Sequence, residues 1–174
     1  MNLMFISDIH GSEYWLDQAL KVYKEGDFDR LIILGDLLYH GPRNPLPQGY
    51  NPQNVLVKLN ALKEDIIAIQ GNCDSEVDQM VLEFPILNKE CHLLLDNQDF
   101  YLCHGHHLDE AQLPNIRQGT IICHGHTHIP RIDTVDSYTL FNPGSITLPK
   151  MSTPHSYGTY IDGELRVMDL EGHL

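Results

Sequence analysis

The fold is decided by residues 2–36, which read NLMFISDIHGSEYWLDQALKVYKEGDFDRLIILGD. The apolar run 2–7 predicts a buried strand, and the apolar run 30–34 predicts a second one. Between them, Ser12 is a suitable N-cap for a helix that ends near Gly26. Strand, helix and strand at this spacing form a βαβ unit, whose strands pair in parallel through a right-handed crossover. The buried stripe of the helix is expected to be Trp15, Leu16, Ala19, Leu20 and Tyr23.

The alternation of strands and helices continues to about residue 82 and then gives way to strands alone. After a Pro/Gly-rich loop at 40–52, Asn51 and Pro52 predict the start of a second helix that runs to about Leu62. A length of 174 residues suits one domain, so we expect a single α/β domain over residues 1–174. The remaining predicted segments are a strand at 65–70, a helix at 75–82, a hairpin of 92–95 with 99–103, and strands at 120–123, 138–142, 159–161 and 164–168.

The charge of the chain restricts its partners. The formal net charge is −13, with 11 basic residues against 24 acidic ones. This balance disfavours a long nucleic acid, because contacts to phosphates need clustered Lys and Arg. No apolar run approaches the roughly 20 residues needed to cross a bilayer, and the first residues lack the basic region of a signal peptide. We therefore expect a cytoplasmic protein with no membrane contact, whose anionic substrate would need bound cations nearby.

Histidine is the unusual residue in this composition. Six of the eleven histidines fall in two short stretches, 104–107 and 124–128. The four cysteines form no Cys-x-x-Cys pair, which argues against a zinc knuckle or a thioredoxin motif. Cys91, Cys103 and Cys123 are expected to be small core residues.

Five predicted strands end in a polar residue beside a glycine or a histidine. In α/β sheets ligands bind beyond the carboxyl ends of the strands, so these loops should meet at one edge. Glycine permits the sharp turns and close approaches that such a site needs. The five loops carry Asp8 and His10, Gly35-Asp36, Gly71-Asn72, His104-Gly105, and Gly125-His126-Thr127-His128.

The donor types in these loops indicate a divalent metal site. Oxygen from Asp and Asn with nitrogen from His suits Mn²⁺, Fe²⁺, Co²⁺, Ni²⁺ or Zn²⁺ better than a soft copper site or an all-oxygen Ca²⁺ site. The number of candidate ligands exceeds what one tetrahedral ion needs and suits two octahedral ions that share a bridge.

These motifs resemble those of the calcineurin-like metallophosphoesterases, and they occur in family order across residues 8–128. The run Asn142-Pro143-Gly144-Ser145 and the loop 40–45 are similar to the small bacterial and archaeal branch, which includes phosphodiesterases. The resemblance implies a four-layer α/β/β/α sandwich of two mixed sheets, with the site at one edge. It also implies a first metal held by Asp8, His10, Asp36 and His128, and a second held by Asp36, Asn72, His104 and His126, with Asp36 bridging.

A dinuclear site of this kind implies a phosphodiesterase for small or activated substrates. Two ions roughly 3.5–4 Å apart can share a hydroxide that attacks phosphorus while they neutralise the developing charge. By resemblance Mn²⁺ is the expected ion, ahead of Zn²⁺, Ni²⁺, Co²⁺ and Fe²⁺. Asp36, Asn72 and Cys73 are the candidate catalytic residues.

Cys73 departs from the pattern of much of the family, where a histidine at this position contacts the phosphate and can protonate the leaving oxygen. A thiol has an unperturbed pKa of about 8.5 and donates weak hydrogen bonds. We therefore expect better rates on esters with acidic leaving groups. Arg43 is a second candidate substrate contact, because a guanidinium suits phosphate oxygens.

Several histidines are left without a ligand role. His126 and His128 are two apart, so an extended segment would turn both to one side; His124 shares that parity but is assigned to the core or the inner surroundings of the site. His106 can line the pocket, and His107 is expected to be solvated. His40 either packs or borders the substrate. Packing or surface roles are assigned to His92, His155 and His173.

Two alternative functions stay open at this point. A phosphomonoesterase of the same fold would use the same metals. A non-catalytic protein-binding scaffold is the other, because a eukaryotic trafficking subunit shares this fold; such a scaffold is free to lose ligands, whereas all seven are present here. The sequence is also compatible with a homo-oligomer of the phosphodiesterase.

Overall fold

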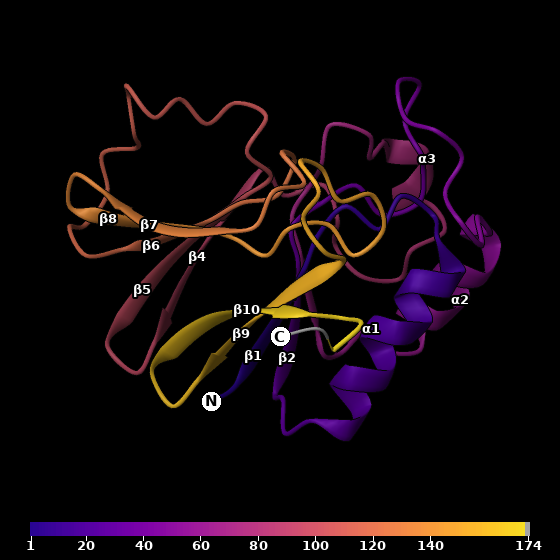
Figure 1. Ribbon diagram of the computed structural model, residues 1–174, viewed down its shortest axis with the longest axis horizontal. Helices are drawn as coiled ribbons and strands as arrows, with labels where there is room; N and C mark the ends of the chain where they lie inside the picture. The colour runs from indigo at the N-terminus through magenta and orange to yellow at the C-terminus, as the bar shows by residue number, and fades with distance from the viewer. Residues whose placement is uncertain (173–174) are drawn as a thin grey trace.

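The chain, seen here as a computed structural model that describes residues 1–172, is built on two five-stranded sheets (Figure 1). In the first sheet the strands run in the order β10-β9-β1-β2-β3. The strands β1, β2 and β3 are parallel, and β9 and β10 add an antiparallel hairpin at one side. The bounds are β1 (Leu3–Ile6), β2 (Arg30–Ile33), β3 (Ile66–Ala68), β9 (Ser156–Ile161) and β10 (Glu164–Asp169).

The second sheet has the order β4-β5-β6-β8-β7. Its centre is parallel, since β6 pairs in parallel with both β5 and β8, while β4 and β7 are antiparallel edge strands. Both sheets are therefore mixed, as predicted. The bounds are β4 (Glu90–Leu95), β5 (Gln98–Cys103), β6 (Ile121–Cys123), β7 (Arg131–Val135) and β8 (Tyr138–Asn142).

Three helices lie on the same side of the molecule, beside the first sheet (Figure 1): α1 (Glu13–Glu25), α2 (Pro52–Asn60) and α3 (Glu76–Gln79). The Ser12 hydroxyl caps α1 by accepting from Trp15 N, and α1 buries the five residues predicted for its stripe. Trp15 is a packing residue, as expected, and stacks on His155 with 3.4 Å between ring centroids. None of the helices in residues 1–172 has the length and hydrophobicity to cross a membrane.

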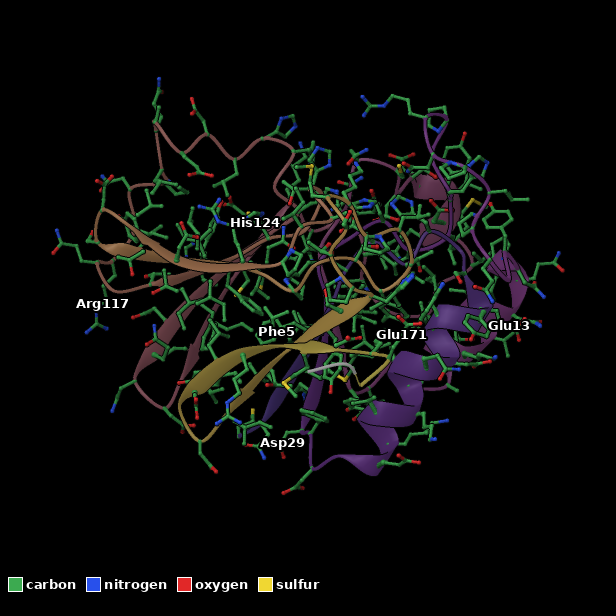
Figure 2. All side chains as sticks on the ribbon, viewed as in Figure 1. Phe5, Glu13, Asp29, Arg117, His124 and Glu171 are labelled. Carbon is green, nitrogen blue, oxygen red and sulfur yellow. The ribbon has the colours of Figure 1, made fainter. Side chains whose placement is uncertain are left out.

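Two apolar layers hold the sheets in place. Helices pack on one face of the first sheet through Met4, Ile6 and Leu31 among others. Phe5 lies between the two sheets (Figure 2). Its ring packs against those of Phe100 and Phe141. The outer face of the second sheet is covered by the irregular segment 104–119, which packs Leu108, Leu113 and Ile116 on it. The fourth layer of the sandwich is thus formed by this segment in place of a helix.

Local differences from the sequence-based expectation have simple causes. The strand β7 was not predicted, because its exposed edge position leaves it a polar sequence, RIDTV. The helix predicted over 75–82 ends early in α3, and the chain then turns so that Leu82 reaches the core. Cys123 is buried as predicted, whereas Cys91 and Cys103 are half-buried. His173 lies outside the described residues.

Candidate metal centre

The loops after β1, β2, β3, β5 and β6 meet at one edge of the sandwich and bring all seven predicted metal ligands together. We call Asp8, His10 and His128 the inner half, because each of these side chains is buried. We call Asn72, His104 and His126 the outer half. Asn72 is exposed and His126 is half-buried; His104 is buried, but it belongs to this group because it is hydrogen-bonded to Asn72. Asp36 lies between the halves.

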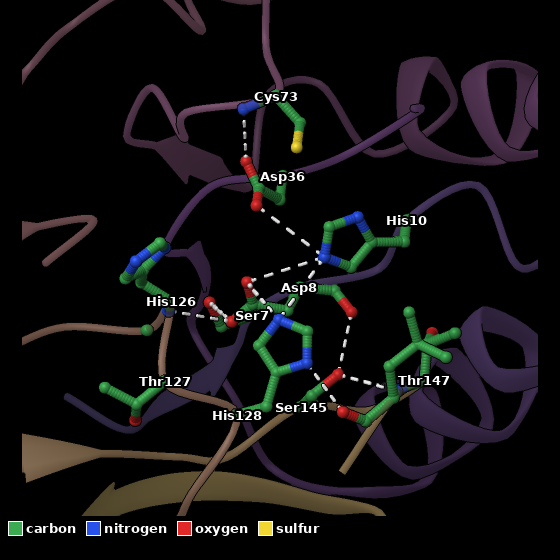
Figure 3. A network of polar contacts seen from close by, with 12 residues as sticks. Ser7, Asp8, His10, Asp36, Cys73, His126, Thr127, His128, Ser145 and Thr147 are labelled. Carbon is green, nitrogen blue, oxygen red and sulfur yellow. Dashed lines mark hydrogen bonds and ion pairs between the residues drawn. The ribbon is translucent and has the colours of Figure 1, made fainter. Parts of the chain in front are cut away.

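The inner half presents an unpaired carboxylate oxygen. Asp8 Oδ2 accepts from the Ser7 hydroxyl at 2.7 Å and from His126 N at 3.0 Å (Figure 3). Asp8 Oδ1 is buried and accepts no hydrogen bond within residues 1–172, although His128 Nε2 and His10 Nε2 lie 3.2 and 3.7 Å away. A buried anionic oxygen without a donor is costly. A cation among these atoms would satisfy it.

Backbone carbonyls fix the orientation of three imidazoles. The Nδ1 atoms of His10, His104 and His128 lie 2.8, 2.6 and 2.6 Å from the carbonyl oxygens of Tyr39, Leu34 and Leu148. A carbonyl only accepts, so each Nδ1 carries the proton and each Nε2 faces the site. This arrangement is typical of histidines that bind metals.

The outer half is held together by its own hydrogen bonds. Asn72 Oδ1 lies 2.9 Å from His104 Nε2 and 2.8 Å from His126 Nδ1. Asp36 Oδ2 faces both halves, at 3.6 Å from His10 Nε2 and 3.4 Å from His104 Nε2. Its other oxygen, Oδ1, accepts from Cys73 N at 2.8 Å. One carboxylate oxygen therefore lies next to donors from each half.

The electrostatics follow from these contacts. Burial alone would raise the pKa of Asp8, but the surrounding imidazoles of His128, His104 and His10 hold that pKa well below its usual range. Burial opposes protonation of His104, yet the hydrogen bond to Asp36 and the charges of Asp8 and Asp36 outweigh it and raise the pKa of His104 to about 9. A proton on His104 Nε2 therefore competes with a metal ion for the space beside these two carboxylates.

The residues present fit divalent metal ions. Around an ion with bonds of about 2.1 Å, adjacent ligand atoms lie about 3.0 Å apart in octahedral geometry and about 3.4 Å apart in tetrahedral geometry. The separations between facing donor atoms here, 2.8 to 3.7 Å, are close to those values. Groups of ligand atoms that could hold an ion include Asp8 with His10 and His128, and Asp8 with Asp36 and His104. Mixed oxygen and nitrogen donors without an obligatory thiolate suit the first-row divalent ions named above.

The backbone at the ligands is left-handed, which the sequence analysis did not predict. Asp8, His10, Asp36, His126 and His128 all have φ between 47° and 66°. The expectation that His126 and His128 share a side on an extended segment is wrong for this reason: His126 turns to Asn72, and His128 turns to Asp8. Both still reach the site, one in each half.

One glycine shows how closely the loops approach. Gly35 has φ +100°, and a Cβ there would lie 2.6 Å from His104 Nδ1 and 2.7 Å from Gly71 Cα. No side chain fits at this position, so glycine is needed both for its backbone angle and for the space.

Supporting residues were missed by the sequence analysis. The buried Asp74 carboxylate accepts from the backbone N–H groups of Asp36, Leu37 and Gly71, at 2.8, 2.8 and 2.7 Å, and so joins two ligand loops. The Ser145 hydroxyl donates to the Asp8 carbonyl at 2.9 Å and accepts from Thr147 N and Leu148 N (Figure 3). Ser145 ends the run 142–145 quoted above, and Asp74 lies two residues after the predicted ligand Asn72, which was the available signal.

The predicted substrate contacts line a cavity of about 450 Å³ over the site. Cys73, Arg43 and Lys150 line it together with Asp36 and His128. Burial and the Asp36 carboxylate raise the pKa of Cys73 to about 12, so its thiol stays neutral. Arg43 is exposed. Lys150 was not among the predicted substrate contacts.

A second cavity of about 490 Å³ adjoins Asn72 and His104 on another side, and exposed His106 and His107 line it.

The remaining histidines lie away from the ligand atoms. His124 is buried beside the Gly125 carbonyl and Asn142, at 3.2 and 3.4 Å, which is a core position (Figure 2). Its Nε2 has no hydrogen-bond partner in residues 1–172. His40 packs edge-on against the rings of Tyr39 and Tyr50.

Comparison with known proteins agrees with this geometry. The chain matches the model of the calcineurin-like phosphoesterase superfamily domain over residues 1–161. It is 44% identical over 170 residues to phosphodiesterase YfcE of Escherichia coli strain K12, covering 98% of this chain and 92% of that protein. It is 28% identical over 164 residues to the probable metallophosphoesterase YsnB of Bacillus subtilis strain 168, covering 90% and 82%.

Solved structures give the same result. The structure of Escherichia coli YfcE, described as a phosphoesterase, superposes with a TM-score of 0.95 over 98% of this chain and 93% of that one. Vacuolar protein sorting 29 of Cryptosporidium parvum superposes with a TM-score of 0.61 at 16% identity, over 96% and 95%, which shows the fold alone. The chain belongs to the calcineurin-like phosphoesterase superfamily and is a metal-dependent hydrolase of phosphoric esters.

Proposed function

We propose that this protein is a phosphodiesterase for small or activated substrates, with two divalent ions held by the inner and outer halves. The position of Asp36 Oδ2, within 3.6 Å of a histidine nitrogen from each half, is the observation that carries the proposal. We assign Asp8, His10, Asp36 and His128 to the first ion, and Asp36, Asn72, His104 and His126 to the second. The name of the relative YfcE supports the choice of diesters.

When bound, the two ions would supply the nucleophile, a hydroxide that they share, and offset the charge that develops on the phosphoryl oxygens. Asp36 and Asn72 have their catalytic part in holding these ions at the reacting centre. Cys73 faces the same cavity as a neutral thiol, and it assists the leaving oxygen weakly because a thiol is a poor donor. Arg43 brings a cation to the substrate from the loop beside it.

The remaining parts of the proposal rest on the donor set and the charge. Mn²⁺ is the proposed ion, with Zn²⁺, Ni²⁺, Co²⁺ and Fe²⁺ as ions that the same nitrogen and oxygen donors accept. The partner is a small phosphodiester rather than a long nucleic acid, given the net charge of −13. We propose that the chain acts as one catalytic domain in the cytoplasm, and a homo-oligomer is compatible with this role.

The test is a panel of mono- and diesters assayed after metal removal and again after adding back single metals. We expect activity on aryl phosphodiesters to vanish with chelator, return with Mn²⁺, and exceed activity on the matched monoesters. Preference for monoesters would replace the proposal by a phosphomonoesterase of the same fold. Full activity in strong chelator, or inertness toward every ester, would reject it.

A further inference from the structure

The cavity over the metal centre has two basic side chains without partners. Arg43 and Lys150 line this cavity, and neither forms an ion pair within residues 1–172. Six of the other nine basic side chains pair with carboxylates: Arg30, Lys58, Lys63, Arg117, Arg131 and Arg166. The remaining three, Lys21, Lys24 and Lys89, form no ion pair within residues 1–172 but line other cavities. Two unpaired cations at the mouth of one cavity therefore have their charge available to a ligand.

Hydrogen bonds position the two backbone segments that carry Arg43 and Lys150. Lys150 N donates to the carbonyl of the ligand His128 at 3.2 Å, so the lysine is tied to the inner half. Arg43 stands in the loop after β2, where the Asn44 amide donates to the His40 carbonyl at 2.9 Å and closes the turn. The cations come from different segments, and they share the cavity with Cys73 and Asp36.

A simple diester does not need this additional positive charge. Two divalent ions would bring four positive charges, while Asp8, Asp36 and a shared hydroxide would offset three of them. The scissile group of a phosphodiester carries one negative charge, which neutralises the remainder. Arg43 and Lys150 add two positive charges, of which the buried Asp74 carboxylate, bonded to Asp36 N, offsets one. The remaining charge matches a further anion on the substrate.

We propose that Arg43 and Lys150 bind a second anionic group, a carboxylate or a phosphate, on the arm of the substrate that lies in this cavity. The inference rests on the proposed function and narrows it to diesters that carry such an extra anion. The neighbouring cavity has a different character, because Lys89 is accompanied there by Glu90 and Asp109. It suits an uncharged arm better than an anionic one.

The test uses binding instead of turnover, with two phosphonates that lack an ester bond. Benzylphosphonate and 4-(phosphonomethyl)benzoate differ only by the carboxylate, and titration calorimetry on the Mn²⁺-loaded protein gives the Kd of each. We expect the carboxylate to tighten binding about tenfold at low salt, as an added close charge pair can. The advantage should shrink as ionic strength rises.

Variants then locate the effect. Lys150→Gln and Arg43→Gln should each reduce the tenfold ratio of the two Kd values to about threefold, and the double variant should bring it to about one. Lys21→Gln, which removes an exposed cation of α1 that forms no ion pair among the described residues 1–172, should leave the ratio at about ten. Thermal unfolding of each variant checks that the fold is intact.

Equal Kd values for the two phosphonates in the unaltered protein would overturn the inference. A ratio that survives the double variant would overturn it too, as would a ratio that disappears in Lys89→Gln, which would place the anion in the neighbouring cavity. Failure of the proposed function gives a different result, in which neither phosphonate binds and no diester is hydrolysed in the presence of metal.

Discussion

The inner and outer halves of the metal centre contain similar ligands in different surroundings. In the inner half, Asp8, His10 and His128 are at most 3% exposed, and backbone carbonyls orient both imidazoles. In the outer half, Asn72 is exposed and pairs with His104 and His126. The inner half is thus built to receive an ion, while the outer half must give up its own hydrogen bonds first. We expect the inner ion to bind first and more tightly.

The largest effect should come from removing what the halves share. Asp36→Asn keeps the size of the side chain and removes its charge, so kcat should fall at least about 10³-fold, as for loss of a central electrostatic group. Metal analysis should show fewer than two ions per chain. Wild-type turnover with full metal content would mean that Asp36 does not bridge the halves.

Cys73→His tests whether a better proton donor in the cavity over the metal centre can assist the leaving group. A neutral thiol with a pKa of about 12 gives little help to an alkoxide, whereas a histidine can act as a general acid. Rates on alkyl diesters should rise about 10²-fold relative to aryl diesters, at the lower end of general acid catalysis. Matched series of alkyl and aryl diesters measure this change, and identical rate profiles for both proteins would refute it.

The order of metal binding tests the comparison directly. In Asn72→Ala we expect the tighter ion to keep its affinity and the weaker ion to bind about 10- to 100-fold less well. His10→Ala should weaken the tighter ion instead. Calorimetric titration of the metal-free protein with Mn²⁺ follows both steps. Equal affinities for the two ions in the unaltered protein would refute the expectation that the inner half binds its ion more tightly than the outer half.

The smallest expected effect concerns the support behind the inner half. Ser145→Ala removes the hydroxyl that donates to the Asp8 carbonyl and accepts from Leu148 N, whose own carbonyl orients His128. The inner ion should bind about tenfold less tightly, and excess Mn²⁺ should restore activity. Thr134→Ala, at an exposed site on β7, is the matched control. Activity that stays low at saturating metal would point to general unfolding instead.

The sequence predicts the fold well wherever burial sets the pattern. The buried stripe of α1 and the strands β1, β2 and β5 were predictable from the spacing of their apolar residues, because that spacing reflects which face of an element is buried. The strand β7 and the irregular layer over the second sheet escape this reasoning. An edge strand in solvent and a segment fixed by only a few side chains leave no periodic signal.

The site was predictable in its members and less so in its geometry. The motifs placed seven candidate ligands near one edge, and the structure brings those seven together. The division into halves was not readable, because the left-handed turns at His126 and His128 depend on contacts with distant loops. The role of Lys150 could not be predicted for a related reason: only folding brings Lys150 into the same cavity as Arg43.

The left-handed backbone at five ligands has a consequence for how such a sequence can drift. A non-glycine residue in this conformation costs roughly 1–2 kcal/mol, and glycine would relieve that cost at Asp8, His10, Asp36, His126 or His128. Each relief would also delete a metal donor. At these five positions the requirements of stability and of metal binding therefore oppose each other. A homologue that no longer needs catalysis could gain stability through single substitutions to glycine that an active enzyme cannot tolerate.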